Sequence, residues 1–141
     1  MTNLDIVGDN IDRLVNVELR PRRRGVSAKL YESARKKTGR PLTLEAAERL
    51  TKKVKRSDTV IISSGFMVPF WFPKGETDGV LGAAALARAI HLGLEAKVLL
   101  LCEQEVAPVM EATLRAATMR TFNYADLKKM PIAMAIESFP M

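Results

Sequence analysis

The spacing of apolar residues divides the chain into two parts with different periodicity. Over residues 1–57 apolar positions such as Leu4, Ile11 and Leu14 recur at three- or four-residue steps, which is the period of an amphipathic helix. In the rest of the chain, short β-branched runs alternate with helical stretches. The pattern therefore predicts a helical N-terminal segment over 1–57 and an α/β segment over 58–141, together forming one domain.

Three helices are predicted in the N-terminal segment. The first carries the apolar positions above, and the turn-prone run Arg20-Pro-Arg-Arg-Arg-Gly25 ends its pattern. The second is expected over residues 27–37, with Gly39 as its stop. Thr43 is expected to cap the third helix, because its hydroxyl can satisfy a free backbone N–H.

The second part of the chain predicts a parallel sheet. Strands are expected over 58–64, 97–102, 120–123 and 132–137, with helices over 80–92 and 105–117. The first strand is β-branched and typical of a strand buried on both faces. Pro108 should delay the start of the second helix, because proline fits only the first turn. This alternation predicts a doubly wound, Rossmann-like α/β fold preceded by N-terminal helices.

Composition indicates the class of protein and its cellular compartment. The chain has 141 residues, of which 48% are hydrophobic and 27% charged, as in a globular protein with a single core. Apolar runs such as Val98–Cys102 are far shorter than the roughly 20 residues that cross a membrane. The N-terminus lacks the pattern of a signal peptide, and Cys102 is the single cysteine, so we expect a cytoplasmic location.

The net charge of +6 is unevenly distributed. Residues 1–57 contain 15 Lys/Arg and seven Asp/Glu, whereas residues 58–141 contain seven and nine. The cationic run at 20–24 raises the question of nucleic-acid binding, but no aromatic residues are interleaved with it. A charge run of this kind is typical of a solvated face, so nucleic acid is not the favoured partner.

The loop after the first strand holds the candidate site. Ligands of parallel sheets bind beyond the carboxyl ends of the strands. Thr77 or Asp78 is placed to cap the following helix, and free N–H groups from Gly79 onward would bind an anion such as a phosphate or carboxylate. Gly65 would let the chain turn sharply off the strand, and Gly79 would let a ligand approach the backbone. The spacing matches neither the dinucleotide nor the P-loop pattern.

Several interpretations of this loop remain open. Asp78 could be a simple helix cap, and Glu76 a solvated loop acid. Two carboxylates separated by one residue also suit a divalent cation, although they make an incomplete ligand set. The apolar cluster in the loop is expected either to form a lid or to meet a partner subunit; it comprises Phe66, Met67, Phe70, Trp71 and Phe72.

The same residues carry a family resemblance. The relevant segments are Ile61-Ile-Ser-Ser-Gly-Phe66, Glu76-Thr-Asp-Gly-Val-Leu-Gly82, Lys97-Val-Leu-Leu-Leu101, Asn10-Ile-Asp-Arg-Leu14 and the 42–50 helix. They resemble the D-glutamate cyclase-like C-terminal domain family over nearly the whole chain. The resemblance implies a lyase that converts D-glutamate to 5-oxo-D-proline and water. It also implies Glu76 and Asp78 as catalytic residues, and Ser64, Gly65, Thr77 and Gly79 as substrate-binding residues.

One departure from the family affects the expected activity. Members are normally about twice as long and carry a segment of the type Gly-Asp-Gly-Gly-Asn-Glu-Ile-Gly, which this sequence lacks. We therefore expect an N-terminal portion of such a protein, with an apolar last strand that favours homo-oligomers or association with a missing C-terminal half. The alternatives to an enzyme are a non-catalytic module that binds a small anion or metal, and an inactive fragment.

Overall fold

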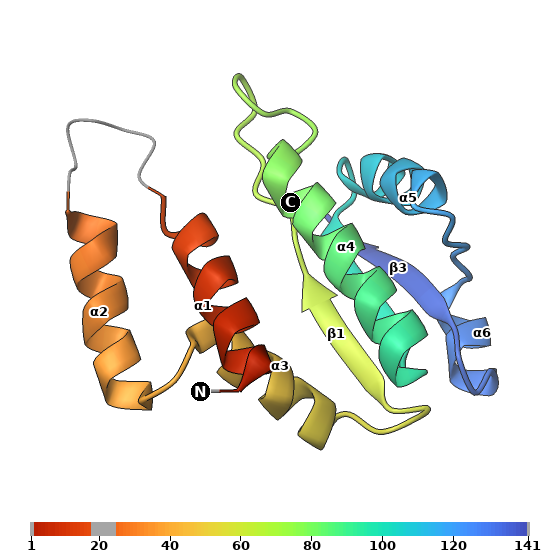
Figure 1. Ribbon diagram of the computed structural model, residues 1–141. Coiled ribbons are helices and arrows are strands. Elements are labelled where there is room, and N and C mark those ends of the chain that lie inside the picture. The colour runs from red at the N-terminus through yellow and green to blue at the C-terminus, as the bar shows by residue number, and fades with distance from the viewer. Residues whose placement is uncertain (1, 18–24, 141) are drawn as a thin grey trace. The chain divides into compact units, whose positions relative to one another are not determined.

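The chain folds into two compact units. The structure, a computed structural model, describes residues 2–17 and 25–140 (Figure 1). A helical unit extends to Lys53, and an α/β unit begins at Val54. The basic run at 20–24 lies outside the described residues.

The helical unit contains the three helices that the periodicity predicts. They are α1 (Asn3–Val15), α2 (Val26–Thr38) and α3 (Leu42–Lys53). A capping box starts α1: the Thr2 hydroxyl accepts the Asp5 N–H at 3.2 Å, and the Asp5 carboxylate accepts the Thr2 N–H at 2.7 Å. Gly39, with φ +75°, follows α2 as its left-handed cap and confirms the expected stop.

The start of α3 differs from the prediction, because its cap comes from another helix. The Asp12 carboxylate of α1 accepts the N–H groups of Leu42 and Thr43 at 2.7 and 3.0 Å. The Thr43 hydroxyl donates to the same carboxylate at 2.6 Å instead of capping the helix itself. The prediction of Thr43 as the cap is therefore wrong, since a buried acid on α1 already satisfies these donors.

The α/β unit is built on a parallel sheet, which confirms the predicted fold class. Strands β1 (Thr59–Ser63), β2 (Lys97–Glu103) and β3 (Met134–Phe139) pair in the order β1-β2-β3. Helices α4 (Thr77–Leu94) and α5 (Ala107–Ala116) form the two crossovers. The sequential strand order makes β2 the central strand, with the carboxyl ends of all three strands at one edge (Figure 1).

The two faces of the sheet are covered differently. Alternate residues Val98, Leu100 and Cys102 of β2 are buried on the face covered by α4 and α5. On the other face, Leu99 packs in a smaller cluster with Leu127 of the short helix α6 (Tyr124–Lys129). Helices therefore contribute to both faces, as in a Rossmann-like sheet.

Strand β1 is not buried on both faces, contrary to the prediction. Among the described strands β1 pairs with β2 alone and lies at the edge of the sheet, so its side chains are covered less than those of the central strand. Val60 and Ile62 are partly buried, whereas Ile61 is 60% exposed. A β-branched run indicates a strand without revealing whether a neighbour covers each face.

The predicted strand over 120–123 is reduced to one parallel bridge between Phe122 and Ala135. Phe122 N–H donates to the Met134 carbonyl at 2.7 Å. The next residue, Asn123, already caps α6 by accepting the Asp126 N–H at 2.8 Å, so extended pairing stops there. The described sheet accordingly has three strands instead of four, and α6 was not predicted.

The observed bounds of the crossover helices α4 and α5 also differ in part from the predicted bounds. Helix α5 starts at Ala107 with Pro108 in its first turn, which confirms the late start. Helix α4 begins three residues earlier than predicted and continues past Gly93. Its cap is Glu95, whose φ of +49° provides the left-handed ending that was expected of the glycine.

Candidate functional site

Three of the predicted site residues meet at the carboxyl edge of the sheet. Ser64 N–H donates to the Leu101 carbonyl at 2.9 Å, which holds the end of β1 against β2. A Cβ placed on Gly79 would lie 3.3 Å from the Ser64 Oγ and 3.5 Å from the Gly65 carbonyl oxygen. The first turn of α4 is thus packed closely on the start of the loop, and Gly79 permits this approach.

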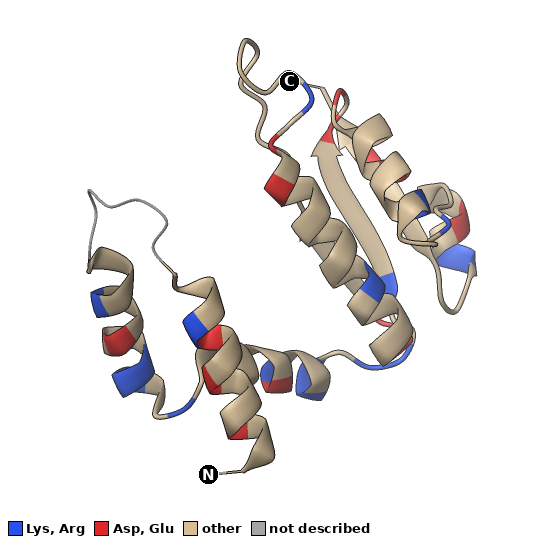
Figure 2. Cartoon of the chain, turned by 45° about the horizontal axis from the view of Figure 1, so that its top comes forward, with Lys and Arg blue, Asp and Glu red and all other residues tan. Residues whose placement is uncertain are grey.

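The acidic residues lie at the start of α4, but its cap differs from both predicted residues. The cap position is Glu76, with φ −70° and ψ 137°, and Thr77 is already helical. The Glu76 side chain makes no capping hydrogen bond. Glu76 is partly buried, whereas Thr77 and Asp78 are exposed. Figure 2 shows acidic segments at the start of α4, where carboxylates are favoured by the helix dipole.

The Gly79 N–H is already engaged, which corrects the expectation of a free donor at this position. It donates to the Asp78 Oδ1 at 3.0 Å. A ligand anion at Gly79 must therefore compete with the Asp78 carboxylate.

Glu103, the last residue of β2, belongs to the same edge but was not predicted. Its Oε1 accepts the Phe66 N–H at 3.1 Å. Its Oε2 is buried and has no hydrogen-bond partner in the part of the chain that the structure describes. A Cβ on Gly65 would overlap this carboxylate, so a larger residue there would displace the acid. The available sequence signal was an acid directly after an apolar strand.

The Glu103 carboxylate also affects the pKa of Cys102, its neighbour in β2. Cys102 is buried among core residues, and this burial, followed by the adjacent Glu103 charge, raises the pKa of the thiol. A raised pKa keeps the sulfur protonated and weakly nucleophilic. Cys102 is therefore a core residue rather than a nucleophile of the site.

The aromatic part of the loop forms a small hairpin. Val68 and Phe72 are bridged antiparallel, with the Phe72 N–H donating to the Val68 carbonyl at 2.7 Å. At its tip Phe70 is 97% exposed and Trp71 is 79% exposed. Gly75, with φ +86°, returns the loop against Val106, where a Cβ would meet a methyl group at 3.0 Å. The lid and partner interpretations both remain predictions.

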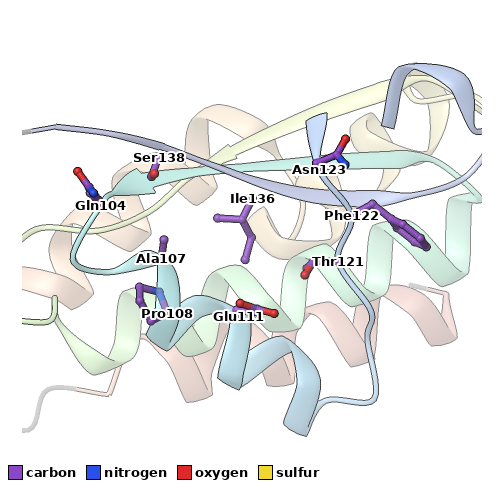
Figure 3. A pocket seen from close by; sticks show the side chains of 9 residues that line it. All are labelled: Gln104, Ala107, Pro108, Glu111, Thr121, Phe122, Asn123, Ile136 and Ser138. Atoms are coloured by element: carbon purple, nitrogen blue, oxygen red, sulfur yellow. The ribbon is translucent and has the colours of Figure 1, made fainter. Parts of the chain in front are cut away.

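A groove of about 620 Å³ lies between α5, the segment 121–123 and β3 (Figure 3). Gln104 and Ser138 line its end near the carboxyl edge, and Glu111, Thr121 and Phe122 line the remainder. The predicted site residues do not line this groove. Gln104, which lines one end of the groove, directly follows Glu103 in the chain.

Among residues 2–17 and 25–140, no three His, Cys, Asp or Glu side chains gather in a way that could hold a metal ion. None of the helices in these ranges is long and apolar enough to cross a membrane.

The fold and site define an α/β protein with a Rossmann-like sheet and an acidic, glycine-lined carboxyl edge. Residues 11–139 match the family model described as D-glutamate cyclase-like, C-terminal. The chain therefore belongs to this family. Comparison with curated proteins and with solved structures gives no match.

Proposed function

We propose that the carboxyl edge of this sheet binds a small amino-acid carboxylate, and that the reaction is the conversion of D-glutamate to 5-oxo-D-proline and water. The observation that carries the proposal is the close packing of Ser64, Gly65 and Gly79 at the start of α4. Membership of the D-glutamate cyclase-like family supports the choice of substrate. A helix start of this kind attracts carboxylates through its N–H groups and dipole.

The reaction sets two requirements on the site. The substrate ammonium group loses one proton, and the amine nitrogen then forms a bond to the γ-carboxyl carbon and loses a second proton. A carbon–oxygen bond breaks, and the departing oxygen takes up two protons in total and leaves as water. A base must accept the first proton, and donors must stabilise the charge on the carboxyl oxygens.

We assign the base to Glu76 or Asp78 and the carboxylate contact to the start of α4. A substrate carboxylate that takes over the Gly79 N–H displaces the Asp78 carboxylate from its 3.0 Å hydrogen bond. Asp78 is then available to accept a proton from the substrate. Thr77 and Ser64 supply hydroxyl groups at the same edge that can orient the carboxylate.

The test is turnover of D-glutamate, followed as 5-oxoproline by proton NMR, with binding measured by calorimetry. We expect Asp78→Asn or Glu76→Gln to reduce the rate about a hundredfold or more, as for loss of a general base. Glu32→Gln is the matched control, since this acid is exposed on α2. Unchanged D-glutamate binding and turnover in both site variants would contradict the assignment.

A second candidate is binding of a small carboxylate without turnover, as expected for a regulatory module or an inactive fragment. The exposure of Thr77 and Asp78 favours it, because loss of water from a substrate is helped by a site that excludes solvent. D-Glutamate binding without 5-oxoproline formation supports this candidate. Metal analysis of the purified protein tests the divalent-cation alternative at the two loop acids.

A further inference from the structure

We infer that Glu103 binds the ammonium group of the amino acid, and thereby selects amino acids over simple dicarboxylates. This inference rests on the proposed function, since it concerns the same carboxyl edge. Glu103 is a positioning residue in this assignment: it fixes the nitrogen that must later attack the γ-carboxyl group.

The Glu103 carboxylate has one hydrogen-bond donor among the described residues, although one of its two oxygens is buried. Phe66 N–H donates to Oε1, while Oε2 is buried without a partner among the described residues. No lysine or arginine of residues 2–17 and 25–140 forms an ion pair with it. An oxygen left in this state costs free energy, and a cationic donor would recover it.

The backbone around Glu103 is fitted to its carboxylate. A Cβ at Gly65 would overlap the Glu103 carboxylate, so a larger residue there would displace the acid or the loop. The same Gly65 contributes the carbonyl oxygen that lies 3.5 Å from a Cβ placed on Gly79. The loop therefore contacts the acid on one side and the helix start on the other.

The groups on the two sides of Gly65 favour ligand charges of opposite sign. The start of α4 favours a negative group, and Glu103 favours a positive one. An ammonium group offers three N–H donors and a full charge, which suits a carboxylate that lacks donors. Glu103 is partly buried as a residue, but its Oε2 is itself buried against Gly65, so binding of the ammonium group to this oxygen requires the Gly65 loop to shift. A negative group at α4 and a positive group at Glu103 are what an amino-acid zwitterion provides, since it carries a carboxylate and an ammonium group.

The experiment compares two ligands that differ in the amine. Calorimetry of the full chain is carried out with D-glutamate and with glutarate, which has both carboxylates but no ammonium group. We expect Glu103→Gln to weaken D-glutamate binding about tenfold or more and to leave glutarate binding unchanged. Glutamine keeps the shape and an acceptor for the Phe66 N–H. Glu103→Asp keeps the charge and should retain part of the preference for D-glutamate.

Glu95→Gln is the matched control, since this exposed acid lies beyond the opposite end of α4. If Glu103→Gln weakens the binding of both ligands equally, or weakens the binding of neither, the inference is overturned. Equal wild-type affinity for glutarate and D-glutamate also overturns it, and this measurement does not depend on whether a variant folds. In that case carboxylate binding at α4 still stands. Failure of the wild type to bind either ligand contradicts the proposed function itself, and the inference with it.

Discussion

Asp12 shows how a single side chain can organise a helical unit. Its buried carboxylate accepts the Leu42 and Thr43 N–H groups, the Thr43 hydroxyl, and the Tyr31 hydroxyl at 3.0 Å. Burial acts to raise the pKa of the Asp12 carboxyl. The hydrogen bonds from Thr43, Leu42 and Tyr31 outweigh burial, so that its pKa falls below the usual range. One residue of α1 thus links all three helices.

We predict that Asp12→Asn destabilises the helical unit by about 3 kcal/mol, because an amide presents N–H donors to groups that are themselves donors. Urea unfolding followed by circular dichroism measures the change. Asp9→Asn is the control on the same helix, since Asp9 is partly exposed and contacts Arg35. Loss of this ion pair should lower the free energy of unfolding by less than about 1 kcal/mol. Equal effects of the two substitutions would show that burial of the Asp12 carboxylate is unimportant.

Residue-level contacts mark the limit of what sequence can predict. The apolar period predicts α1, and glycine correctly predicts the end of α2. The Asp12 cap joins residues about 30 positions apart, and Glu103 meets Gly65 across the sheet edge. Such contacts depend on tertiary packing, so local patterns favoured Thr43 as a cap and left Glu103 unnoticed.

At the scale of elements, α6 covers the second face of the sheet. Leu127 is buried in a cluster with Leu99 and Ala135, next to the bridge at Phe122. A six-residue helix has too few turns to be stable by itself, so this packing holds it in place. Its shortness also explains why periodicity did not predict it.

We predict that Leu127→Ala destabilises the α/β unit by about 3 kcal/mol, through lost burial and a residual cavity. Leu92→Ala is the control, because this leucine is exposed on α4. It should change stability by less than about 0.5 kcal/mol. Thermal unfolding of both variants provides the measurement, and similar losses would argue against α6 as part of the core.

At the scale of the whole molecule, acid-sensitive carboxylates are concentrated in the helical unit. The pKa of Asp5 is lowered by hydrogen bonds from the Thr2 N–H and hydroxyl. The pKa of Glu48 is lowered by hydrogen bonds from Arg40 and Lys52. Together with Asp12, these groups stabilise the folded unit while they are ionised.

We predict that acid unfolds α1–α3 before the sheet. A carboxyl with a lowered folded-state pKa contributes stability above its unfolded pKa of about 4, and this contribution is lost as the pH falls through the lower folded value. In backbone amide NMR spectra recorded from pH 7 to pH 2, the signals of the helical unit should therefore disappear before those of the sheet. Asp12→Asn should reduce this pH dependence, with Asp5 and Glu48 accounting for the remainder. Earlier loss of the β1–β3 signals would contradict the prediction.

The exposed tip of the aromatic hairpin has a practical consequence for studying this protein. Trp71 is the single tryptophan of the sequence, and it lies in the loop that leads from β1 to the start of α4. Its indole is largely surrounded by solvent, so its emission responds to any change in hydration of the loop. The chain thus carries an intrinsic fluorophore beside its candidate site. Loop movement can be followed in real time without a label or an added chromophore.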